Sequence, residues 1–234
     1  MSSFRAVPIA LAAALVIGTG AAFAQEADDE MLDGGIDGTW TIDTEIGDFE
    51  DFSNSWVGFR VAEVLNPGGE VDAVGRTPLV SGQLEATGSV IESAVIEADL
   101  SAIISDKSRR DSAIQRALGT VEFPTATFGS TEPVDIGADA VEGSPFTVSL
   151  PGLLTIRDVS QEVMLELTGQ RVDDVVVVVG TLPVTFSSFG VTMPTAPVVV
   201  SVEDSGDLEW QLFFRYEAGV ADDEMVDEDT IAEE

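Results

Sequence analysis

In the stretch LEWQLFFRY, residues 208–216, every second side chain is large and apolar, and most of those between them are polar. A repeat of two residues is the spacing of a β-strand, because successive side chains of a strand point to opposite faces of the sheet. The stretch therefore predicts a strand with a wet face and a dry face, and the dry face carries Trp210, Leu212 and Phe214.

The same alternation recurs through most of the chain between residues 38 and 217. Val57, Phe59 and Val61 share one face of a predicted strand, for example, with Arg60 on the other. Strands are predicted over residues 39–43, 56–64, 80–86, 90–100, 126–131, 146–156, 163–167, 175–186, 198–202 and 208–216, with turns at 66–69 and 205–206. Short strands at this spacing predict an all-β fold, either an antiparallel sandwich or a barrel.

The predicted dry faces are rich in aromatic side chains, namely Trp40, Phe59, Phe128, Trp210 and Phe214. Two interpretations of this interior remain open. The side chains can fill an ordinary core, which periodicity alone favours because packed interiors are the rule. Alternatively, the sheet closes into a barrel wide enough to hold a slender apolar molecule.

One segment, SRRDSAIQRALG at residues 108–119, has the spacing of a helix rather than of a strand. Ser108 is the predicted N-cap, Asp111 lies near the positive end of the helix, and Gly119 ends it. Arg110 shares a helical face with Ile114, Ala117, Leu118 and Val121.

Positive charge is concentrated in this helical segment. The chain has ten Lys and Arg against 43 Asp and Glu, and four of the ten are Lys107, Arg109, Arg110 and Arg116. A guanidinium on an apolar face needs a partner if it is buried, so Arg110 is expected to bind either an interior carboxylate or a ligand group. Arg109 and Arg116 are expected to pair with carboxylates of the acidic surface.

Composition excludes several classes of function. The chain has no His and no Cys, so the common nucleophile–base pairs, most zinc and haem sites, and disulfides are absent. No phosphate-binding loop or nucleophile elbow is present. A net charge of −33 argues against nucleic acid and anionic membrane surfaces as partners. The sequence thus predicts a protein that is not an enzyme and needs no cofactor or metal.

The two ends of the chain differ from its middle. Residues 1–24 resemble a secretory signal peptide with a cleavage site after Ala24, so we expect a protein exported to the periplasm or the outside of the cell, with no stable membrane insertion after cleavage. An uncleaved anchor is the alternative. Residues 25–37 and 218–234 are acidic and predict a disordered linker and a disordered tail.

The helical segment and the sequence after it, RRDSAIQRALGTVEFPTATF at residues 109–128, resemble the signature of the YceI-like family of secreted lipid- and polyisoprenoid-binding proteins. GTWTID (38–43), SWVGFRV (55–61), GLLTIRDVSQEVMLEL (152–167) and FSSFGV (186–191) are similar to further segments of that family. The resemblance covers residues 38–217. Ser188 departs from it, because many members have an acidic residue there, and the acidic loop at residues 44–54 is longer than usual.

The resemblance implies a lipocalin-like antiparallel β-barrel of about eight strands with one short α-helix. It also implies non-catalytic binding of a long isoprenoid chain, such as a quinone tail or polyprenyl lipid, inside the barrel. The candidate ligand-binding residues are Trp40, Phe59, Arg110, Ile114, Phe128, Phe189, Trp210, Leu212 and Phe214. The alternative is a structural or interaction sandwich with a filled core.

Overall fold

The computed structural model describes residues 36–141 and 143–217. The predicted signal peptide, residues 25–35 of the predicted linker, and the tail at 218–234 lie outside the described residues. Residues 36 and 37, which we expected in the linker, belong to the folded domain instead. Ile36 is buried in the core, its backbone N–H donates to the carbonyl of Gly88, and the carboxylate of Asp37 accepts from the N–H of Gly88.

Strands make up most of the described chain, and every paired strand is antiparallel to its neighbour. They are β1 (Gly38–Ile42), β2 (Trp56–Leu65), β3 (Gly69–Thr77), β4 (Val80–Thr87), β5 (Val90–Asp99), β6 (Thr125–Ser130), β7 (Val134–Asp135), β8 (Phe146–Ile156), β9 (Val159–Val172), β10 (Val175–Thr185) and β11 (Val199–Glu217). The helices are α1 (Ser108–Leu118), a single turn α2 (Ala138–Val141), and the 3₁₀ turns η1 (Leu100–Ala102) and η2 (Phe186–Phe189).

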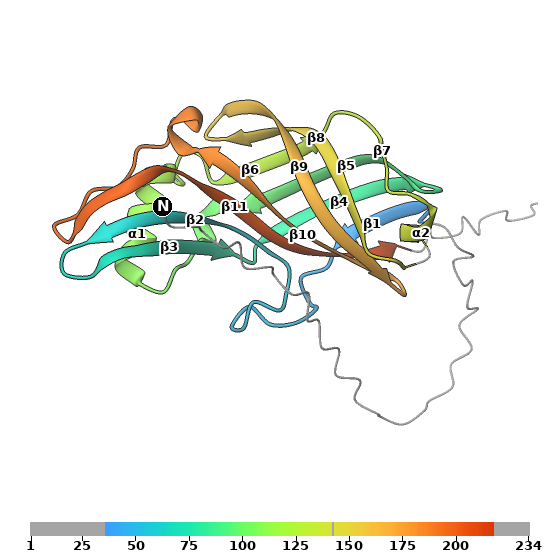
Figure 1. Ribbon diagram of the computed structural model, residues 1–234, viewed down its shortest axis with the longest axis horizontal. Helices are drawn as coiled ribbons and strands as arrows, with labels where there is room; N and C mark the ends of the chain where they lie inside the picture. The colour runs from blue at the N-terminus through green and yellow to red at the C-terminus, as the bar shows by residue number, and fades with distance from the viewer. Residues whose placement is uncertain (1–35, 142, 218–234) are drawn as a thin grey trace, which may run out of the picture. The chain divides into compact units, whose positions relative to one another are not determined.

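Eight strands form a closed barrel, in the order β1-β4-β5-β6-β8-β9-β10-β11, because β11 pairs back onto β1 (Figure 1). The long strand β11 makes this closure possible. Its last residues pair with β1, whereas the preceding part pairs with β2, and β3 extends the sheet beyond β2. The predicted eight-stranded antiparallel barrel is therefore confirmed.

The seam between β1 and β11 carries a charged cluster. The guanidinium of Arg215 donates to Asp43 at 2.6 Å and to Asp174 at 2.7 Å. Burial acts to raise the pKa of Asp43, but hydrogen bonds from Arg215 and from the N–H groups of Glu45 and Ile46 outweigh it and lower the pKa below its ordinary value of 3.8. The ionised carboxylate of Asp43 thus stabilises the seam.

Stability should consequently depend on pH through Asp43. A depressed folded-state pKa contributes stability above the unfolded value of 3.8, and this contribution is lost as the pH falls through the folded-state pKa. We expect Asp43→Asn to be less stable than the parent at neutral pH and the difference to shrink below pH 3.8 in urea unfolding. Glu92→Gln, at an exposed position of β5, is the control. A difference that does not vary with pH would contradict the assignment.

Two longer segments differ from the strand prediction, besides the two-residue strand β7, which was also not predicted. Strand β3 was not predicted, because only small residues face inward along its second half: Ala73, Gly75 and Thr77. The turn predicted at residues 205–206 is wrong, since β11 runs through it, with a bulge opposite β2 between Val202 and Gly206. Glycine thus signalled a turn where the chain remains extended.

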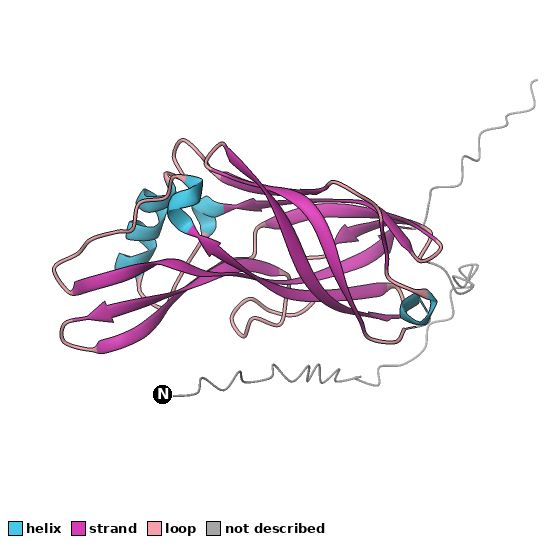
Figure 2. Cartoon of the chain, turned by 45° about the horizontal axis from the view of Figure 1, so that its top comes forward, coloured by secondary structure: helices cyan, strands magenta, loops and turns pink. Residues whose placement is uncertain are grey.

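Helix α1 has the predicted extent but not the predicted cap. Ser108 is already helical, and the N-cap position is Lys107, which makes no side-chain capping bond. Asp111 lies in the first turn and accepts from the N–H and hydroxyl of Ser105, which fixes the entering loop. Gly119 ends the helix in the left-handed conformation, as predicted. Helices α1 and α2 lie near opposite ends of the barrel (Figure 2).

Candidate functional site

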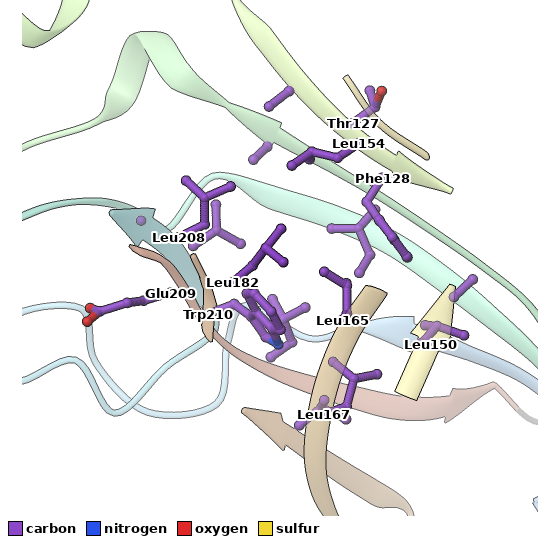
Figure 3. A pocket seen from close by; sticks show the side chains of 18 of the residues that line it. Thr127, Phe128, Leu150, Leu154, Leu165, Leu167, Leu182, Leu208, Glu209 and Trp210 are labelled. Atoms are coloured by element: carbon purple, nitrogen blue, oxygen red, sulfur yellow. The ribbon is translucent and has the colours of Figure 1, made fainter. Parts of the chain in front are cut away.

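The inner side chains of the barrel enclose a cavity of about 180 Å³. An engineered apolar cavity of ~150 Å³ is already large enough to remain dry and to bind benzene. Leucines from β8, β9, β10 and β11 surround the space together with Trp210 and Phe128 (Figure 3). The barrel is therefore hollow, and the filled core that periodicity alone favoured is wrong.

Most of the predicted site residues line this cavity. The structure places seven of them there: Trp40, Phe59, Phe128, Phe189, Trp210, Leu212 and Phe214. Phe59 and Trp210 are half-buried although they lie on the inner face, as are Leu182 and Leu208. Side chains inside a packed core are normally buried. The surface that these four side chains expose therefore faces the cavity.

Sequence reasoning missed several lining residues, including Phe146, Leu150, Leu154, Leu182 and Phe186. Leu182 and Phe186 lie at every second position from Val176 and Val178 along the strand that was predicted over 175–186, so the alternation signal was present. The sequence did not show the strand order, in which β8 and β10 pair with opposite edges of β9.

The charged groups at the cavity wall are engaged by protein atoms. Glu209 points away from the leucines and binds Arg60 at 2.8 Å and Arg76 at 3.5 Å (Figure 3). Arg171 donates to the carbonyls of Val141 and Asp173 and lies 5.7 Å from the centre of the Trp40 ring. Since the remainder of the wall is almost entirely apolar, the cavity suits a ligand without charges along its length.

The cavity extends between the two helical ends of the barrel. Leu118 of α1, Phe189 of η2 and Ile103 line it at one end, and Ala140 of α2, Trp40 and Ile36 line it at the other. A strand of ten residues is ~33 Å long, and barrel strands tilt by about 35–45° from the axis, so such a barrel is ~25 Å long. A volume of about 180 Å³ distributed along such a barrel must be narrow.

Two predicted site residues lie outside the cavity wall. Ile114 is buried in the core, and Arg110 binds two carboxylates, those of Glu63 on β2, at 2.5 Å, and Asp106. The side chain of Glu63 is only 6% exposed. Of the two partners that the sequence left open for Arg110, the interior carboxylate is therefore correct, and its guanidinium anchors α1 to β2.

The other cations of α1 lie on the surface. Lys107 pairs with Asp106 at 3.4 Å, with both side chains exposed. Arg109 and Arg116 are exposed, and the expected ion pairs with carboxylates do not form within residues 36–141 and 143–217. Val121, which was predicted to lie on the buried face, follows the end of α1 and is fully exposed.

The end of α1 is tied to η2 by Arg157, in the turn between β8 and β9. Its guanidinium donates to the carbonyls of Ala117 and Gly190. Helix carbonyls at a C-terminus have no partner within the helix, so this arginine satisfies one of them. Arg157 thereby holds Leu118 and Phe189 together at this end of the cavity wall.

The long acidic loop at residues 44–54 packs on the outside of the barrel. Its carbonyl groups at Phe52 and Asn54 accept from the side chain of Gln211, and the guanidinium of Arg76 lies 4.4 Å from the Phe52 ring and 4.2 Å from the Trp56 ring. Gln211 and Arg76 belong to the outer faces of β11 and β3. The loop therefore covers the outer faces of β3 and β11, and none of its residues lines the cavity.

Neither a metal centre nor a membrane helix is found in the described part of the chain. It contains no cluster of three or more acidic side chains placed to hold a metal ion. None of its helices has the length and apolar character needed to cross a bilayer.

The barrel is similar to several solved structures. A polyisoprenoid binding domain from Saccharophagus degradans implicated in plant cell wall breakdown gives a TM-score of 0.58 at 14% identity, covering 77% of this chain and 99% of that one. BcnA of Burkholderia cenocepacia gives 0.54 at 20% identity, covering 68% and 95%. The YCEI protein of Campylobacter jejuni gives 0.50 at 15% identity, covering 62% and 85%. At these identities the likeness concerns the fold alone.

No curated protein is a significant sequence match. A family match is nevertheless clear, because residues 40–214 match the YceI-like domain and span the barrel from β1 to β11. The chain belongs to the YceI-like family.

Proposed function

We propose that this protein is a non-catalytic carrier that holds one long apolar chain, such as a polyisoprenoid, an isoprenoid quinone or a similar lipid, in the barrel. The observation that carries the proposal is the long, narrow and almost wholly apolar cavity. A slender hydrocarbon chain would leave water for this apolar space and gain van der Waals contacts with its wall.

Two further observations support the proposal. One structural neighbour is a polyisoprenoid binding domain, and the family match spans the whole barrel. The absence of His and Cys from the sequence removes the commonest catalytic groups.

We also propose that residues 1–24 direct export, so that the carrier acts in the periplasm or outside the cell.

Native mass spectrometry of the full-length protein tests the proposal. We expect the protein isolated from its own cells to retain a lipid, and the delipidated protein to bind geranylgeraniol, a flexible prenyl alcohol, in preference to cholesterol, a rigid fused-ring molecule. The physical reason is the narrow cavity, which a single chain can enter without moving the wall. The proposal would be contradicted if the isolated protein retained no lipid and the delipidated protein bound no apolar probe.

A further inference from the structure

Five strand glycines that point into the barrel each lie against the ring of an aromatic residue on the cavity wall. A side-chain carbon at any of these positions would lie less than 3.0 Å from a ring atom, closer than real contacts allow. The pairs are Gly75 with Phe59, Gly152 with Phe128, Gly169 with Phe146, Gly180 with Trp210, and Gly206 with Phe186.

The backbone dihedral angles do not require these glycines. None of the five has a φ angle in the left-handed region, so other residues could adopt the same backbone conformation. Glycine in a strand interior is unfavourable, because it loses conformational entropy and has no side chain to pack. What each glycine provides is space for a ring that lies over its Cα, and Gly152, Gly180 and Gly206 also leave room for a backbone carbonyl oxygen of a neighbouring strand. Rings placed in this way lie along the wall rather than across the lumen.

Phe59 and Phe186 give the clearest case. Their rings meet edge to face, with centres 6.2 Å apart, near the end of the cavity that η2 lines. Each ring is backed by a glycine on a neighbouring strand, Phe59 by Gly75 and Phe186 by Gly206. A methyl group on Gly75 would force the ring of Phe59 to move, and the side facing the lumen is the open direction. A methyl group on Gly206 would press on the ring of Phe186 and also on the backbone carbonyl of Arg60.

We infer that these ring-facing glycines set the width of the cavity and thereby restrict the ligand to a single slender chain. This inference rests on the proposed function. The glycines do not contact the ligand themselves, and they act by positioning the aromatic rings that do. Replacing the rings by smaller side chains would widen the lumen. Adding side chains at the glycine positions would push the rings inward and close it.

Gly75→Ala is the most direct test, because a carbon added there meets only side chains: Cε1 of Phe59 at 2.6 Å and Cγ2 of Ile103 at 3.3 Å. We expect the dissociation constant for geranylgeraniol to rise about tenfold, the effect of overpacking by one methyl group. Gly129→Ala is the matched control. Gly129 is also a strand glycine, but an added carbon would have no atom within 4 Å, so binding should not change.

The double variant Gly75→Ala/Phe59→Leu separates cavity width from general damage to the fold. Removing the ring relieves the overlap, so we expect this variant to bind geranylgeraniol more tightly than Gly75→Ala, even if Gly75→Ala itself folds poorly. Unchanged binding in Gly75→Ala, or no recovery in the double variant, would overturn the inference.

Xenon binding, followed by NMR in the parent and in Gly75→Ala, keeps this inference distinct from the proposed function. Xenon occupies apolar cavities whatever the natural ligand. Weaker xenon binding in Gly75→Ala supports the role of the glycine even if the parent binds no prenyl alcohol, which would defeat only the proposed function. Equal xenon binding in both proteins would overturn the inference even if the parent binds lipid.

Discussion

Arg110→Ala is expected to lower the free energy of unfolding by about 3 kcal/mol, the cost of removing one partner from a buried ion pair. The carboxylate of Glu63 is 6% exposed and binds the guanidinium of Arg110 at 2.5 Å. Without Arg110, that charge would remain buried with neither a partner nor adequate hydration. Helix α1 would also lose its ionic attachment to β2. Urea unfolding of the parent and the variant measures the difference.

Arg109→Ala and Arg116→Ala are the matched controls, because they remove the same side chain from exposed positions of the same helix. Surface substitutions of this kind change stability by less than about 0.5 kcal/mol. Replacing both partners, as in Glu63→Leu/Arg110→Met, should recover much of the loss, since it leaves no buried charge. Equal, small effects from all three alanine variants would show that Arg110 acts as an ordinary surface cation.

The position of Arg110 shows how far helical spacing can predict a site. Spacing correctly placed it on the inward side of α1 with Ile114, and burial then required a partner. The partner itself could not be predicted, because Glu63 is 47 residues away in the sequence and is one of many acidic residues. Only the packing of α1 against β2 selects it.

Alternation predicted most of the barrel and most of the cavity wall, because inward-facing positions are the same whether the interior is filled or hollow. It failed at β3 and within β11, and both failures involve ring-facing glycines. Gly75 leaves β3 without a large inward residue, and Gly206 gives β11 the appearance of a turn. These glycines make room for Phe59 and Phe186, aromatic residues on other segments, and a sequence read one strand at a time does not show that relationship.

Leu182→Asp is expected to weaken the binding of geranylgeraniol by more than about 100-fold, because it places a carboxylate on the apolar wall where the ligand chain would lie. Leu182 lines the cavity beside Leu208, its partner on the neighbouring strand β11, and is only half-buried, so its replacement exposes the new charge to the lumen rather than to a packed core. A chain bound there would have to desolvate that charge. Titration of the delipidated protein with the prenyl alcohol measures the effect.

Leu153→Asp makes the same chemical change on the outside of the barrel, where Leu153 is 41% exposed, and it should leave binding intact. If Leu182→Asp does not fold, Leu182→Trp replaces it, since the larger apolar ring occupies the lumen without adding charge. A ligand within the barrel must be displaced by both inward changes and must remain bound after the outward one. Binding that survives at position 182 but is lost at position 153 would place the ligand on the outer surface and would refute a carrier that works through its cavity.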